Sequence, residues 1–137
     1  MKHTTRQAAQ IGLLLITLLA LALRLYRLDG QSFWADEMSS LVSAAKPVPR
    51  LLHDISNEIH PPGYHLTLKA WVGIFGIGEA GVRSLSVFFG LALVLLTYLI
   101  GRRISGEWAG LVAAFLAAIS PFQVYYSQEA RMHMPLA

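Results

Sequence analysis

The stretch Ile11–Leu23 reads IGLLLITLLALAL and contains no charged residue. Extended to Ala8–Leu28, the apolar run is about 20 residues long, which is enough to cross a bilayer core of about 30 Å as an α-helix. Arg24, Tyr26 and Arg27 close the run, and we expect these amphipathic side chains to reach the membrane interface. The stretch therefore predicts a membrane-spanning helix over residues 8–28.

A cleavable signal peptide is the competing interpretation of this segment, because Lys2 and Arg6 form a basic region before the apolar block. Signal peptides end in a small-x-small cleavage site, and Arg24–Asp29 does not provide one. We therefore favour a retained signal-anchor helix.

The composition extends the membrane interpretation to the whole chain. Of its 137 residues, 55% are hydrophobic and 14% are charged, whereas soluble domains carry about 25% charged residues. The net charge of +3 is small and no basic patch is interleaved with aromatic residues, so nucleic acid is not an expected partner. The absence of cysteine excludes disulfides and thiolate metal sites.

Two further apolar runs predict two further spans. Arg83–Ile100 and Trp108–Tyr125 are each about 18 residues long, and the basic turn Gly101–Glu107 separates them. We expect an all-α membrane protein with about three transmembrane helices. Because the chain ends in Met132–Ala137 without a polar tail, we expect residues 1–137 to be one N-terminal membrane region of a larger multi-spanning fold.

The segment 29–82 between the first two spans is expected to be a structured outer loop. It carries most of the acids, and apolar residues recur at helical spacing within Asp36–Ala45 and Arg50–Glu58. Tyr64–Phe75 is apolar but too short to cross a bilayer, so we expect an interfacial or re-entrant helix there.

Three crossings would place the N-terminus and the Arg102-Arg103 turn on one face of the membrane. Both segments are short and basic, so the positive-inside rule makes that face cytoplasmic and puts residues 29–62 and 126–131 together outside. A fourth crossing by Tyr64–Phe75 would instead put the basic turn outside. We therefore favour three crossings.

Asp36 and Glu37 place two acids side by side just after the first span. Neighbouring positions on a helix point about 100° apart, so the two acids serve different partners. One would act on a substrate while the other binds a cation, an arginine or a backbone N–H. Because an acid before a helix is also a common N-cap, the residues alone leave both roles open.

His60 and His65 flank a Pro-Pro-Gly break in the stretch EIHPPGYH, residues 58–65. A metal site would require both imidazoles and a carboxylate to converge on one ion. The two prolines force an extended path between the histidines, so we favour a rigid bend that starts the next helix.

Glu129 and Arg131 follow the third span in the stretch YYSQEAR, residues 125–131. The tyrosines suit an aromatic belt at the membrane interface. An acid and a base on the same face as the first acidic pair suit a functional site, and solvated surface charges are the alternative.

Six short motifs stand in order along the chain: Phe33–Glu37, His60–Tyr64, Gly81–Ser84, Gly101–Arg103, Ser120–Phe122 and Tyr126–Met132. In this order and spacing they resemble the N-terminal part of bacterial membrane glycosyltransferases of the C-type superfamily. The resemblance is closest to the family 39 branch, related to dolichyl-phosphate-mannose–protein mannosyltransferases and to the lipid A aminoarabinose transferase. It covers nearly the whole chain from Arg24 onward.

This resemblance implies an enzyme that moves a sugar from a polyprenyl-phosphate carrier to a lipid, glycan or protein acceptor on the outer face of a bacterial plasma membrane. The family's first-loop acid maps onto Asp36, with Glu37 beside it, and its second outer-loop acid maps onto Glu129. We expect Asp36 to take the acceptor's proton in an inverting displacement. His133 departs from the aromatic residue expected at that position.

The remaining site residues are expected to handle the carrier and its phosphate. His60 and Tyr64 are the candidate contacts for substrate or carrier. Arg83 and Arg131 are the candidates for stabilising the leaving phosphate, which needs cationic or metal neutralisation.

A divalent cation is an open expectation. Glu37 and Glu129 are its candidate ligands, and an oxygen-rich site would suit Mg²⁺ or Mn²⁺.

Two other classes of protein compete with the enzyme: a non-catalytic membrane scaffold or transporter subunit, and an inactive truncated product. A scaffold has no need for acids gathered on one face. A transporter is expected to place ionisable residues in mid-membrane, and Ile11–Leu23 and Trp108–Tyr125 hold none in their interiors.

Overall fold

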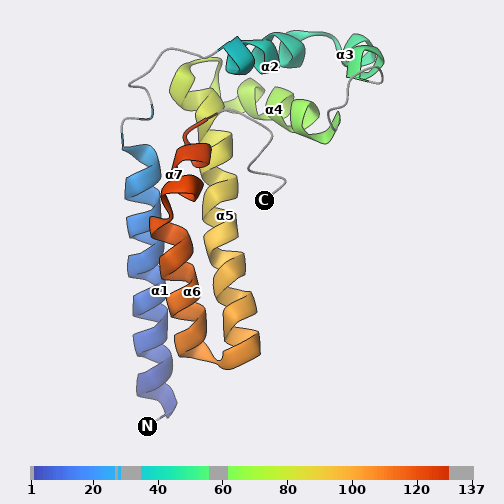
Figure 1. The fold of residues 1–137 in the computed structure, drawn as a ribbon. Coiled ribbons are helices and arrows are strands. Elements are labelled where there is room, and N and C mark those ends of the chain that lie inside the picture. The colour runs from blue at the N-terminus through green and yellow to red at the C-terminus, as the bar shows by residue number, and fades with distance from the viewer. Residues whose placement is uncertain (1, 27, 29–34, 56–61, 130–137) are drawn as a thin grey trace.

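The computed structural model describes residues 2–26, 28, 35–55 and 62–129. Within these residues the chain is helical and contains no strand (Figure 1). The helices are α1 (Lys2–Leu25), α2 (Ala35–Ala45), α3 (Val48–Ile55), α4 (Pro62–Phe75), α5 (Glu79–Ser105), α6 (Glu107–Ile119) and α7 (Pro121–Ser127). The expected all-α membrane fold is confirmed.

Helices α1, α5 and α6 lie side by side as a bundle, and α2, α3 and α4 lie across one end of it (Figure 1). Helices α1 and α6 run toward that end and α5 runs away from it. The N-terminus and the α5–α6 turn therefore share the opposite end of the bundle, while α7 leads back toward α2–α4.

Two helices are long and apolar enough to cross a membrane, Gln7–Leu25 within α1 and Glu79–Ser105, which is α5. The first ends three residues before the expected Leu28, whose N–H donates to the Leu25 carbonyl in a turn. Helix α4 has 14 residues, too few to span, and lies across the end of the bundle as a juxtamembrane helix.

The predicted third span is broken rather than continuous. Helices α6 and α7 meet at Ser120 and are bent by 59°, so the pair is either one bent span or a re-entrant segment. Pro121 has no N–H to donate and disfavours helical geometry at the residue before it. Ser120 accordingly has ψ 119° and accepts a hydrogen bond from the Gln123 N–H as the N-cap of α7.

Small residues allow the bundle helices to approach closely. The bundle core is formed by Ala20, Val94, Tyr98, Ala114 and Ala118. A Cβ at Gly110 would lie 2.7 Å from the Tyr98 carbonyl oxygen, so α5 and α6 cross at a distance that only glycine permits there.

The outward faces of the bundle are apolar, as expected for helices that contact lipid or further helices. Their large exposed side chains include Leu14, Leu15, Leu18, Leu96, Leu99, Val112 and Leu116.

The juxtamembrane helices pack through a second apolar cluster. Tyr64 and Leu68 of α4 pack with Ala44 of α2 and with Val82 and Leu85 of α5. This cluster joins α2 and α4 to the first turns of α5.

Lys69 adds a polar tie between α4 and α2. Its ammonium donates to the carbonyls of Ala44 and Lys46 at 3.0 and 2.7 Å, which satisfies acceptors that the end of α2 leaves free. The expected outer loop is thus held against the end of the bundle.

Candidate functional site

Glu37 and Arg83 form a buried ion pair between α2 and α5. The Arg83 Nε and Nη2 donate to the two Glu37 carboxylate oxygens at 3.0 and 2.8 Å. The Glu37 side chain is 0% exposed and the Arg83 side chain 4%. Such a two-bond contact between a guanidinium and a carboxylate fixes orientation as well as distance.

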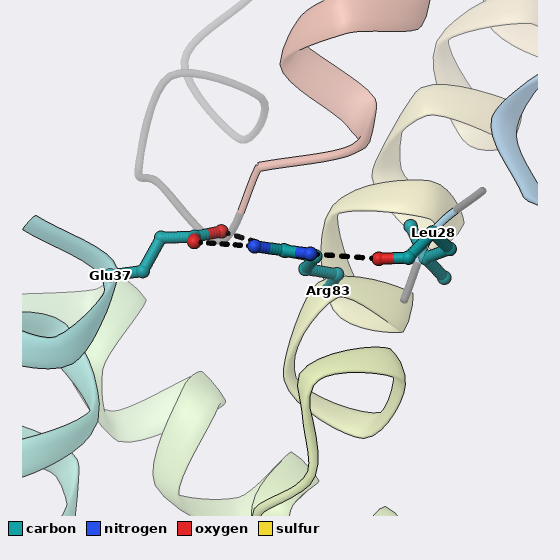
Figure 2. A network of polar contacts seen from close by, with 3 residues as sticks. All are labelled: Leu28, Glu37 and Arg83. Carbon is teal, nitrogen blue, oxygen red and sulfur yellow. Dashed lines mark hydrogen bonds and ion pairs between the residues drawn. The ribbon is translucent and has the colours of Figure 1, made fainter. Parts of the chain in front are cut away.

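The same guanidinium reaches the chain that leaves α1. Arg83 Nη1 donates to the Leu28 carbonyl at 2.8 Å, and Figure 2 shows the guanidinium lying between that carbonyl and the Glu37 carboxylate. Arg83 therefore connects the chain after α1, the first turn of α2 and the second turn of α5. The sequence left a cation, an arginine or a backbone N–H open as the partner of one acid of the Asp36–Glu37 pair, and in the structure Glu37 binds an arginine. That arginine is Arg83, which the sequence assigned to the leaving phosphate.

Asp36 is the second residue of α2, which begins at Ala35. It therefore does not occupy the N-cap position that one interpretation of the sequence gave it. A first-turn acid is still favoured by the helix dipole. Its side chain lies outside the described residues, so its role as a base stays a prediction.

Tyr64 lies in the first turn of α4 and is 7% exposed. Its hydroxyl is buried and has no hydrogen-bond partner among the residues that the structure describes, although most buried polar groups have one. Burial, and secondarily the negative charge of Glu37, raises the pKa of the Tyr64 phenol above its ordinary value. The phenol is therefore a neutral hydrogen-bond donor at physiological pH.

Glu129 follows α7 and is buried, with 6% of its surface exposed. Its negative charge acts on Arg83 more weakly than that of Glu37, which is hydrogen-bonded to the guanidinium. The structure thus brings Glu37, Tyr64, Arg83 and Glu129 to the end of the bundle that α2 and α4 cover. His60 and Arg131 lie outside the described residues.

No metal centre is assembled in the part of the chain that the structure describes. Within it, no three His, Asp or Glu side chains lie together as ligands. Glu37, one of the two candidate ligands, directs both oxygens to Arg83.

The prediction that the Arg24 side chain reaches the membrane interface is wrong. Arg24 is 0% exposed and turned into the bundle, toward the break between α6 and α7. The signal that was available is the Ser120-Pro121 break, because it leaves carbonyls at the end of α6 that need a donor.

Residues 59–137 match the protein family described as "Dolichyl-phosphate-mannose-protein mannosyltransferase". Comparisons with curated proteins and with solved structures give no significant match. The matched segment contains Tyr64, Arg83 and Glu129, whereas Asp36 and Glu37 precede it. Because the match covers more than half of the chain and agrees with the resemblance in its motifs, this protein belongs to the dolichyl-phosphate-mannose-protein mannosyltransferase family of glycosyltransferases.

Proposed function

We propose that this chain is the N-terminal part of an enzyme that transfers a sugar from a polyprenyl-phosphate carrier to an acceptor hydroxyl or amine, with inversion at the anomeric carbon. Family membership supports glycosyl transfer. The observation that carries the site assignment is the Glu37–Arg83 pair, because it fixes the first turn of α2, and with it Asp36, against the end of the bundle.

The chemistry requires one base. The bond between the acceptor atom and the anomeric carbon forms as the bond between that carbon and the phosphate oxygen breaks, and the acceptor loses a proton. A phosphate is already a stable leaving group, so no strong general acid is needed. Asp36 takes the acceptor's proton from the face opposite the phosphate, and Glu37 holds the α2 turn through Arg83 instead of contacting the substrate.

Other groups receive the carrier phosphate. The Tyr64 hydroxyl is a buried donor that gains a partner when a phosphate oxygen approaches, which supports its assignment as a carrier contact. His60 and Arg131 complete the carrier site in this proposal, and Glu129 interacts with Arg83 or with a divalent cation such as Mg²⁺ or Mn²⁺.

The orientation follows from the charge at the two ends of the bundle. Arg102 and Arg103 lie at the α5–α6 turn, the end shared with the N-terminus. The positive-inside rule supports a cytoplasmic location for this end, in a bacterial plasma membrane. The site under α2 and α4 then faces outward, where lipid-linked sugars rather than nucleotide sugars are the donors.

The donor class is tested in membranes that contain the intact protein. We expect transfer of label from polyprenyl-phosphate mannose, the probe donor, and none from a nucleotide sugar when polyprenyl phosphate is absent. Membranes without the protein provide the background. Transfer from the nucleotide sugar alone would contradict the proposed function.

A further inference from the structure

Arg24 occupies the interior of the bundle at the end of α1. Its Nε donates to Ser127 Oγ at 3.2 Å, and its Nη1 donates to the Ala118 and Ala20 carbonyls at 3.1 and 3.2 Å. Its Nη2 donates to the Ala117 carbonyl at 3.4 Å. A buried charge is costly unless it is hydrogen-bonded, so this set of contacts accounts for the presence of an arginine here.

Two of the four acceptors are backbone carbonyls that the α6–α7 break leaves free. A helix end leaves its last four carbonyls without intrahelical partners, and Pro121 has no N–H to offer them. Arg24 satisfies two of these carbonyls, those of Ala117 and Ala118. An arginine of α1 thus stabilises the end of α6 at the bend.

Gln128 makes the reciprocal contact. Its side-chain Nε2 donates to the carbonyls of Leu23, Arg24 and Tyr26 at 3.1, 3.3 and 2.9 Å, which are at the end of α1. Arg24 at the end of α1 therefore stabilises the bend in α6–α7. In return, Gln128, which follows α7, stabilises the end of α1.

Gly90 of α5 makes room for this arrangement. A Cβ at Gly90 would overlap Ser127 Oγ and lie 2.8 Å from Arg24 Nε. Ser127 is 0% exposed and also donates to the Gln123 carbonyl at 2.6 Å. The set formed by Arg24, Gly90, Ser127 and Gln128, called here the Arg24 cluster, is closely packed on three helices.

We propose that Arg24 and Gln128 are positioning residues, which set the direction of α7 and thereby hold the buried Glu129 at the end of the bundle that α2 and α4 cover. Glu129 directly follows Gln128 in the chain, and only 6% of its surface is exposed. The Arg24 cluster thus links the end of α1 to the bend in α6–α7. Its Arg24–Ser127 hydrogen bond joins two residues that are 103 positions apart in the sequence. The catalytic part of this inference rests on the proposed function.

The structural part is tested without any substrate. Residues 1–137 contain no cysteine. In protein with any cysteine beyond residue 137 replaced by serine, spin labels on Leu96→Cys in α5 and Phe122→Cys in α7, two exposed positions, report the spacing of these helices alone. We expect one narrow distance distribution for the unchanged protein in lipid nanodiscs and a broad or shifted one for Arg24→Met. Arg50→Met, the same change at an exposed residue of α3, should leave it narrow.

Two milder variants keep this test decisive if Arg24→Met fails to insert. Ser127→Ala removes one acceptor of Arg24 and should broaden the distribution less than Arg24→Met. Arg24→Lys keeps the positive charge but loses the planar guanidinium with its several N–H donors. The width of its distance distribution should lie between those of Arg24→Met and the unchanged protein. An unaltered distribution in Ser127→Ala and Arg24→Lys would overturn the positioning role.

The catalytic part is tested with polyprenyl-phosphate mannose as the donor. Because misplacement of a site by about 1 Å costs about 100-fold in rate, we expect Arg24→Met to lower kcat by about that factor with little change in the KM for the donor. Arg24→Lys should restore part of the loss. A broadened distance distribution with an unchanged kcat would overturn the catalytic role.

No transfer by the unchanged protein would count against the proposed function, while the spin-label result would still decide the structural part.

Discussion

Arg83 illustrates how one residue can hold three segments of the chain together. Its guanidinium binds Glu37 through two hydrogen bonds and the Leu28 carbonyl through a third. The sequence offered an arginine as one partner for an acid of the Asp36–Glu37 pair, but it did not identify Arg83 as that arginine. Pairing depends on how α2 packs against α5, and no local pattern encodes that packing.

Arg83→Met should destabilise the protein by about 3–5 kcal/mol, because it leaves the Glu37 charge buried without its cation. The free energy of unfolding in detergent is the measurement. Arg50→Met, at an exposed residue of α3, is the matched control and should have little effect. The double variant Arg83→Met/Glu37→Met should recover part of the loss. Equal stability of the two single arginine variants would refute the buried pair.

Tyr64→Phe separates a binding role from a structural one. The Tyr64 hydroxyl is buried without a partner, so its removal should leave stability unchanged or raise it by about 1 kcal/mol. If the hydroxyl donates to the carrier phosphate, the KM for the donor should rise up to about tenfold. Lower stability would contradict the structural description, and an unchanged KM would remove Tyr64 from the carrier site.

The raised pKa of Tyr64 gives a second readout. Its folded-state pKa lies above the unfolded value of about 10. Because the unfolded chain then loses this proton at a lower pH than the folded protein does, ionisation of Tyr64 has no effect on stability below about pH 10 and lowers stability as the pH rises above it. The thermal unfolding temperature of the unchanged protein should accordingly fall more steeply in this alkaline range than that of Tyr64→Phe. An equal fall of the unfolding temperature with pH in both proteins would contradict the raised pKa of Tyr64.

At the scale of the elements, uninterrupted apolar runs predicted helices α1 and α5 well, since length and composition decide whether a segment can span. The break between α6 and α7 was visible as Ser120-Pro121, but its 59° bend was not predicted. The bend depends on donors supplied by Arg24 from another helix. Helix direction at such a break is set by tertiary contacts that are distant in sequence.

Gly110→Ala should weaken the packing of α5 against α6. The new Cβ would lie 2.7 Å from the Tyr98 carbonyl oxygen and 3.0 Å from the Arg102 backbone nitrogen, and backbone atoms cannot move away cheaply. We expect a loss of about 1–3 kcal/mol, typical of overpacking, seen as a lower thermal unfolding temperature in detergent.

Gly73→Ala is the control for this change. Gly73 lies within α4, and a Cβ there meets nothing within 4 Å. Alanine should therefore stabilise the helix by up to about 1 kcal/mol. Equal effects at Gly73 and Gly110 would show that the close approach of α5 and α6 is absent.

At the scale of the whole molecule, the fold separates the end that holds the N-terminus and the basic α5–α6 turn from the end that holds the Glu37–Arg83 pair. The N-terminus and the α5–α6 turn lie at one end, and α2–α4 cover the other (Figure 1). The sequence predicted this separation from helix count and charge. It predicted the contacts of the site less completely. An arginine was one expected partner for an acid of the first pair, but not Arg83 in particular. Arg24 was expected at the membrane interface and is buried in the bundle.

Single cysteines at the two ends test the orientation. Ile104 near the α5–α6 turn and Ile77 between α4 and α5 are 77% and 70% exposed, and residues 1–137 contain no cysteine. Any cysteine beyond residue 137 is replaced by serine for this test. In intact cells, a membrane-impermeant thiol reagent should label Ile77→Cys but should label Ile104→Cys only after lysis. The reverse labelling pattern would place the end of the bundle that α2–α4 cover in the cytoplasm.

The most direct test of the central claim is sugar transfer by Asp36→Asn in the intact protein. The variant has the same size but cannot accept a proton, so kcat should fall by at least about 100-fold, the lower part of the range for a lost general base. Membrane insertion and the unfolding temperature should match those of the unchanged protein. Transfer from polyprenyl-phosphate mannose at the normal rate would contradict the assignment of Asp36 as the base.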